Sequence, residues 1–210
     1  MSAQVIELEE LLRSRDVWRG NDQQRPIAQP GVSTGVWTLD EVLPSGGWPV
    51  GALTEVLAPF DGVGELELLW PALAALTAES DGLVVLVAPR FSPYAPAWHG
   101  AGVRLDRVQI VEASARDALW TAEQCLRAGA CSAVVCWPQT NDDRMLRRLQ
   151  SAAESGQCHG FAIRPSSAGR NPSPAPVRVS IEPGPPRQLR VLKCRGAYPP
   201  STPILFPARR

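Results

Sequence analysis

The chain has 210 residues, of which 44% are hydrophobic, and its formal net charge is zero. This length suits one globular domain with a complete core, and no uninterrupted apolar stretch is long enough to span a membrane. The acidic, amphipathic first residues exclude a signal or transit peptide. The five cysteines are odd in number and form no C-x-x-C pair, which argues for reduced thiols and against a zinc site. We therefore expect a cytoplasmic protein.

The first predicted element is an amphipathic helix at residues 3–19, followed by a linker at residues 20–30. Apolar side chains of the helix repeat on one face, and the linker is rich in Asn, Asp, Gln and Pro. A helix of this kind folds back on its own domain or docks on another protein. We expect docking on a partner, with Leu8, Leu11 and Leu12 as the anchors.

The next elements are a strand, a glycine turn and a helix, the order found around a phosphate-binding loop. The strand covers residues 52–57, and Gly62 and Gly64 form the turn. Such a loop needs a lysine and a hydroxyl for phosphate and Mg²⁺, but Glu65 and Leu66 stand in those positions. A carboxylate there would repel polyphosphate, so the loop is degenerate and predicts no cofactor. The alternative is a plain strand, turn and helix without nucleotide ancestry.

The run before this turn, residues 32–55, resembles the entry to the RecA-type ATPase core. That entry contains S-T-G, L-D and G-G motifs followed by a G-x-L/I-x-E strand. The matching residues here are Ser33-Thr34-Gly35, Leu39-Asp40, Gly46-Gly47 and Gly51-Ala52-Leu53-Thr54-Glu55.

The same resemblance implies that catalysis is lost at two further positions. The strand near residues 83–87 is followed by Ala88-Pro89-Arg90, where the catalytic glutamate is expected. The strand near residues 133–137 ends in Trp137, where an aspartate would hold Mg²⁺. We therefore expect a protein that is not an enzyme, with no catalytic residue, no cofactor and no metal.

Short strands alternate with helices along the rest of the chain, which predicts an α/β fold. We expect a RecA-like core at residues 31–207, with a mostly parallel sheet flanked by helices and antiparallel edge strands near the C-terminus. Residues 1–30 form the separate N-terminal helix and linker. The predicted strands and helices are, in order, strands at 84–87, 108–111, 133–136 and 160–163, and helices at 115–128 and 141–155.

Charge is distributed unevenly along the chain. There are 19 acidic and 9 basic residues up to Asp143, but 2 acidic and 12 basic residues after it. Basic blocks bind nucleic acid or acidic proteins, unless the two halves neutralise each other within the fold. The segment at 164–176 predicts a mobile loop that resembles the single-stranded DNA loop of RecA-like proteins. It lacks stacking aromatic residues, so we expect weak DNA contact through Arg164, Arg170 and Arg178.

The segment at 188–200 predicts a strand with alternating apolar and basic residues. It resembles the RecA stretch in which two basic residues reach a neighbour's ATP, and Lys193 and Arg195 match those positions. The alternative is a solvated edge strand that its charges protect.

The degenerate loop GVGEL and the Arg- and Pro-rich closing segment resemble the ImuA family over residues 31–207. The resemblance implies a non-catalytic adaptor in SOS-induced translesion DNA synthesis. RecA and ImuB are the implied partners, with an error-prone polymerase subunit reached indirectly. The chain also resembles SulA, which implies a division inhibitor that binds the tubulin-like ring protein. A residual nucleotide binder is the third alternative.

Overall fold

The computed structural model describes residues 30–140 and 142–206. The predicted N-terminal helix lies outside the described residues, and so do its anchors Leu8, Leu11 and Leu12. The division of the chain at residue 30 therefore stays a prediction.

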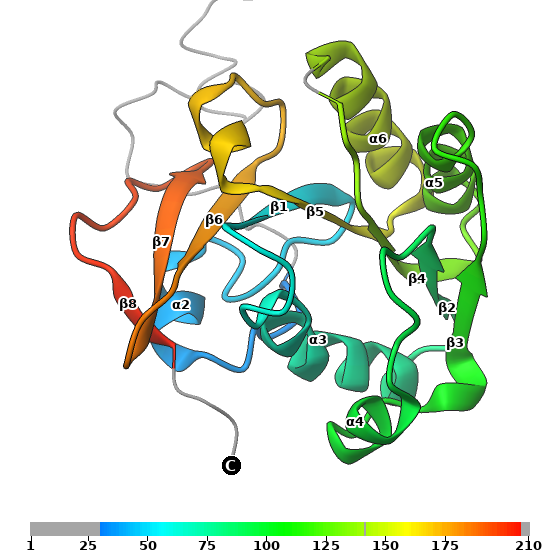
Figure 1. Cartoon of the computed structure of the whole chain (residues 1–210), viewed down its shortest axis with the longest axis horizontal. Helices are drawn as coiled ribbons and strands as arrows, with labels where there is room; N and C mark the ends of the chain where they lie inside the picture. Colours follow the sequence, from blue (N-terminus) through cyan, green and yellow to red (C-terminus); the bar gives the residue numbers. More distant parts are fainter. Residues whose placement is uncertain (1–29, 141, 207–210) are drawn as a thin grey trace, which may run out of the picture.

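An eight-stranded sheet forms the centre of the fold, in the order β3-β2-β4-β5-β1-β6-β7-β8 (Figure 1). Strands β1 to β6 pair in parallel, whereas β7 and β8 are antiparallel. This arrangement confirms the predicted α/β class and the antiparallel strands near the C-terminus. The strands are β1 (Ala52–Ala58), β2 (Leu83–Val87), β3 (Val108–Val111), β4 (Cys131–Cys136), β5 (His159–Pro165), β6 (Val177–Glu182), β7 (Arg187–Cys194) and β8 (Ile204–Phe206).

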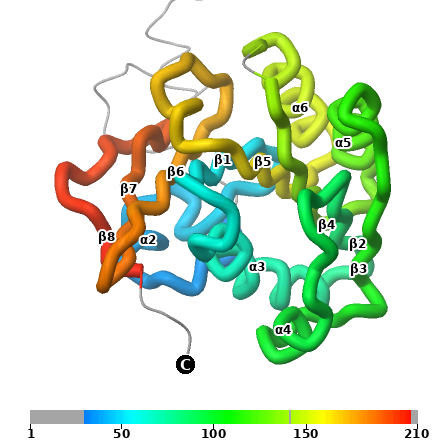
Figure 2. The backbone as a smooth tube through the Cα atoms, viewed as in Figure 1, coloured from blue at the N-terminus to red at the C-terminus, as the bar shows by residue number. Residues whose placement is uncertain are grey.

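Helices cover both faces of the sheet. In Figures 1 and 2, α5 and α6 lie on one side of the sheet and α3 and α4 on the other. The predicted helix at 141–155 is found at nearly the same place, and Asp142 caps it by accepting a hydrogen bond from the N–H of Arg144 at 2.9 Å. The helices are α2 (Trp37–Val42), α3 (Glu65–Glu79), α4 (Ala95–Gly100), α5 (Ala118–Arg127) and α6 (Asp143–Gly156), with short 3₁₀ helices η1 (Leu105–Arg107) and η2 (Ser166–Arg170).

Two hydrophobic clusters fill the space between the sheet and the helices. The larger packs α2 and α3 against one face, where Trp48 meets Phe161 edge to face at a centroid distance of 6.0 Å. The smaller packs α5 and α6 against the other face. Strand β1 contributes side chains to both clusters and is buried along its whole length. Any polar side chain on β1 must therefore find its partners inside the protein.

The motif residues before β1 have a clear local role. Asp40 accepts hydrogen bonds from the hydroxyl of Ser33 at 2.6 Å and from the N–H of Thr34 at 2.9 Å. Gly35 follows with a φ of +77°, and a Cβ there would stand 2.5 Å from Cγ of Pro71 in α3. Asp40 thus holds the S-T-G turn in shape, and Gly35 lets that turn pack closely on α3.

Ion pairs within the fold join the acidic first part of the sequence to its basic second part. This bears out the alternative in which the two halves neutralise each other, at least for the paired residues. These pairs are Glu55 with Arg164 and Arg178, Glu67 with Arg187, Glu123 with Arg148, and Asp143 with Arg147.

Candidate functional site

The turn between β1 and α3 holds one of the chain's own carboxylates where a phosphate loop would hold phosphate. Gly62 and Gly64 adopt φ values of +86° and +114°, which favour glycine. The Glu65 carboxylate accepts the N–H of Gly62 at 2.9 and 3.1 Å and the N–H of Gly64 at 3.2 Å. Glu65 is only 6% exposed. The N–H groups that would cradle a phosphate are therefore already bonded to a negative charge.

Two arginines from outside the turn hold it in place. Arg187 in β7 donates to Glu67 at 2.8 and 3.0 Å and to the carbonyl of Val63 at 3.0 Å. The hydrogen bond to Glu67 raises the pKa of Arg187. Arg90, which follows β2 at the expected catalytic glutamate position, pairs with Asp61 at 2.9 Å. The cation at this position thus supports the loop from outside.

Glu55, in the middle of β1, gathers three polar partners from one face of the sheet. Its carboxylate accepts from Arg164 at 2.9 Å, from Arg178 at 2.6 Å and from the hydroxyl of Ser173 at 2.9 Å. Glu55 is fully buried, because β5 and β6 flank its strand on both sides. Two guanidinium groups share this one carboxylate in the interior.

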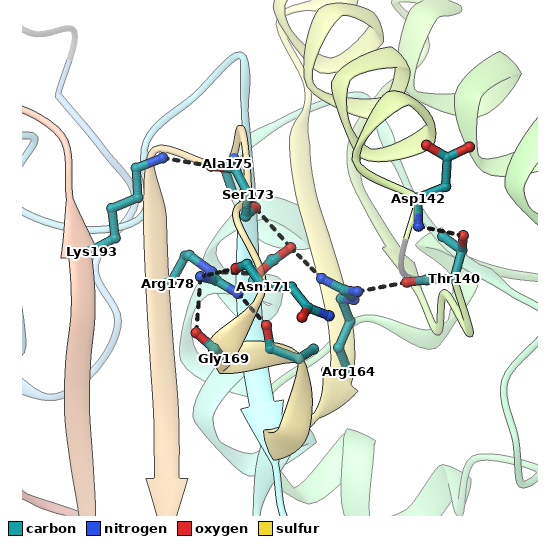
Figure 3. A network of polar contacts seen from close by, with 11 residues as sticks. Thr140, Asp142, Arg164, Gly169, Asn171, Ser173, Ala175, Arg178 and Lys193 are labelled. Carbon is teal, nitrogen blue, oxygen red and sulfur yellow. Dashed lines mark hydrogen bonds and ion pairs between the residues drawn. The ribbon is translucent and has the colours of Figure 1, made fainter.

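Main-chain carbonyl groups before and after β5 accept further hydrogen bonds from these guanidinium groups. Arg178 donates to the carbonyl of Ala168 at 2.8 Å and to that of Asn171 at 3.1 Å, and Arg164 donates to the carbonyl of Thr140 at 2.6 Å (Figure 3). The bonds of Arg178 tie the segment after β5 to the sheet, whereas Nε of Arg164 is buried without a hydrogen-bond partner among the described residues.

These contacts correct the prediction of a mobile DNA-binding loop at 164–176. Arg164 and Arg178 are 2% and 6% exposed, so their guanidinium groups are not on the surface where a DNA phosphate would bind. The sequence showed only arginines among Ser, Pro and Gly, and their acidic partner lies more than a hundred residues earlier. Arg170 is exposed, and its predicted contact with DNA stays a prediction.

Lys193 is the next-to-last residue of β7 and Arg195 follows the strand, whereas the sequence predicted both within one strand at 188–200. The ammonium group of Lys193 donates to the carbonyl of Ser173 at 2.7 Å and is therefore used within the chain (Figure 3). Partial burial lowers the pKa of Lys193, and the positive charges of Arg195 and Arg178 lower it further. Arg195 is exposed. A role of this pair at a neighbour's ATP stays a prediction.

Cys158 and His159 do not form a reactive pair. Burial raises the pKa of the Cys158 thiol and lowers the pKa of His159 to about 4, so both groups are neutral near pH 7. All five cysteines are free thiols, as predicted. Among the described residues, no group of three His, Cys, Asp or Glu side chains is placed to hold a metal ion.

A cleft that the sequence did not reveal opens at the carboxyl ends of β2, β3 and β4. Its cavity measures about 940 Å³, and the segments that follow these three strands form its walls. Ligand sites of open α/β sheets lie at this edge. One wall contains Ala88, a non-glycine residue with a φ of +47°, whose N–H donates to the carbonyl of Val111 at 2.8 Å. Strained residues of this kind gather at functional sites.

The sequence contained one signal for this cleft. Ala88-Pro89-Arg90 and Trp137-Pro138 stand where the resemblance to RecA-type ATPases places catalytic residues. Both follow parallel strands at their carboxyl ends, and β2 and β4 are neighbours in the sheet. The order of the strands was needed to bring the two segments together.

The fold and the turn define an α/β protein whose phosphate-loop position is filled by its own glutamate. Among curated proteins, the cell division inhibitor SulA of Pectobacterium atrosepticum is 31% identical over 144 residues, which cover 68% of this chain and 76% of the relative. SulA of Pectobacterium carotovorum subsp. carotovorum is 31% identical over 121 residues, which cover 57% of this chain and 71% of the relative. The chain belongs to the SulA family.

A solved structure is similar as well. The crystal structure of SulA from Pseudomonas aeruginosa has 29% sequence identity and a TM-score of 0.45, and the match covers 53% of this chain and 96% of that chain. No protein-family model matches the chain. No helix among the described residues is long and apolar enough to cross a membrane.

Proposed function

We propose that this protein is a non-catalytic inhibitor of cell division, induced by DNA damage, that binds the tubulin-like ring protein. Membership in the SulA family carries the proposal, because the matched relatives are cell division inhibitors and the chain covers 76% of the first of them. This function is the alternative that the sequence resemblance implied, and the comparisons favour it over the translesion adaptor.

The absence of catalysis is part of the proposal, together with a RecA-like origin of the core. Glu65 bonds the N–H groups of the altered loop, and Arg90 pairs with Asp61. Trp137, where Mg²⁺ would need a carboxylate, packs against the larger hydrophobic cluster. Isothermal titration with ATP and Mg²⁺ is expected to show no binding heat. A saturable heat with one site per chain would contradict this part of the proposal.

The main experiment measures binding to the purified ring protein and the effect on its polymerisation. We expect the chain to bind the ring protein and to lower the amount of polymer that sediments in the presence of GTP. Expression of the chain in a bacterium that divides with the ring protein is expected to produce filamentous cells. Normal division together with no detectable binding would refute the proposed function.

One observation favours a second candidate function, the translesion adaptor that binds RecA and ImuB. Arg195 is exposed directly after β7, where its guanidinium group can reach a neighbouring protein, and it matches one position of the basic pair in the sequence resemblance. Co-purification with RecA, ImuB and the ring protein in parallel separates the two functions. Under this second function, replacing both residues with alanine should weaken binding to ATP-loaded RecA.

A further inference from the structure

Large apolar side chains are exposed on the segments that form the cleft at the carboxyl ends of β2, β3 and β4. Phe91 and Tyr94 are each 71% exposed and belong to the segment after β2 that forms one wall. Ile110 in β3 is 50% exposed and lines the cavity itself. Trp120 is 58% exposed and follows Leu119, which lines the opposite wall. Apolar groups gathered around a hollow mark a protein-binding surface.

The cleft also adjoins an unpaired sheet edge. Strand β3 is the last strand on its side of the sheet, and among the described residues it pairs only with β2. The carbonyl of Val111 faces β2, since it accepts the N–H of Ala88. Backbone groups alternate in direction along a paired strand, so Val108 and Ile110 direct their N–H and C=O groups away from β2.

The sequence of β3 lacks two of the features that usually protect such an edge, although the strand itself is short, with four residues. It reads Val-Gln-Ile-Val, without charge or proline. Its outward N–H and C=O groups fit only a partner that brings an extended backbone, because a helix has already bonded its own main chain. Edge and cleft are continuous through Ile110, which belongs to both.

We propose that one extended segment of the division target docks here, pairing with β3 as a further strand and placing a large apolar side chain in the cleft. This inference rests on the proposed function and identifies the surface that performs it. The exposed aromatic side chains pack on the docked segment. Glu112 lines the cleft and Arg90 is paired with Asp61, which disfavours a polyanion as the partner.

The test compares cleft variants in binding to the purified ring protein. Ile110→Pro removes the outward N–H of β3 and leaves the hydrogen bonds to β2 intact. Phe91→Ala combined with Tyr94→Ala removes the aromatic rim. We expect each variant to raise the Kd about tenfold or more. Tyr198→Ala, which removes an aromatic residue that is 97% exposed outside the cleft, should leave the Kd within about twofold.

The outcomes separate this inference from the proposed function. No binding by the unchanged chain overturns both. Binding that the cleft variants leave unchanged overturns the docking surface alone. If the aromatic variant binds more weakly but a folded Ile110→Pro variant binds as tightly as the unchanged chain, pairing along β3 is overturned. A different result is that sedimentation shows the unchanged chain to be a dimer and the Ile110→Pro variant to be a monomer. That result would assign the edge to a second copy of the chain and overturn the proposal. If Ile110→Pro fails to fold, the aromatic variant still decides whether the cleft binds the target.

Discussion

Replacing Glu55 with glutamine tests how the centre of the fold is held together. The change keeps the shape of the side chain but removes the negative charge that Arg164 and Arg178 share in the interior. Breaking a buried ion pair costs about 3–5 kcal/mol, because a charge is left without a partner away from water. A domain of this kind has a total stability of roughly 5–15 kcal/mol. The substitution is therefore expected to lower the melting temperature by about 6–20 °C.

Thermal unfolding gives the melting temperature, and urea unfolding gives a midpoint compared at equal slope; tryptophan fluorescence follows both. Glu182→Gln is the matched control, because Glu182 pairs with Arg190 where water reaches both side chains. This control should leave the midpoint nearly unchanged, since exposed ion pairs contribute little. A Glu55→Gln midpoint equal to that of the control would refute the view that this carboxylate holds the two arginines in place.

Three further changes probe other parts of the structure. Burial lowers the pKa of His159 from 6.5 to about 4, so the unfolded chain binds a proton at higher pH than the folded chain does. The free energy of unfolding therefore falls as the pH drops from 6.5 to about 4, by up to about 3 kcal/mol, and His159→Gln should remove this fall. Urea midpoints of both proteins between pH 7 and pH 4 check this, and parallel curves would contradict it. Glu65→Ala should lower the free energy of unfolding by about 1–2 kcal/mol, because the loop N–H groups lose their acceptor. Added phosphate should raise the melting temperature of this variant and not that of the unchanged chain. If phosphate leaves the melting temperature of the variant unchanged, the view that Glu65 occupies a phosphate position is contradicted. Gly35→Ala should lower the melting temperature, because its Cβ would collide with Pro71; wild-type stability would show that the entry segment can shift.

Local sequence patterns predicted most of the fold. Alternating apolar runs marked the parallel strands, and the run at 133–136 lies within the observed β4. Gly62 and Gly64 marked the turn because few other residues adopt their backbone angles. The helix predicted at 115–128 begins later, at Ala118, because Ser114 and Asp117 form a turn before it.

Contacts between distant residues were not predictable in the same way. Nothing near Arg164 or Arg178 in the sequence indicates Glu55, and only the pairing of β1 with β5 and β6 brings the three residues together. The same holds for Arg187, which reaches the turn at Glu67 from the far end of the chain. From sequence alone, arginines in a polar segment are expected to be exposed to solvent, because the sequence does not show their acidic partners.

The sequence by itself determined the class of the fold and the absence of the lysine that a phosphate loop needs, because strand periodicity and the residue at one position are local properties. Only the tertiary structure decided which groups occupy the phosphate-loop position and where the arginines and the cleft lie. In the structure, the Glu65 carboxylate accepts the loop N–H groups, and the two arginines that the sequence assigned to DNA are buried. The ends of β2, β3 and β4 lie around a cleft. Each of these results depends on strand order and on side chains that meet across the sheet, which short-range patterns do not encode.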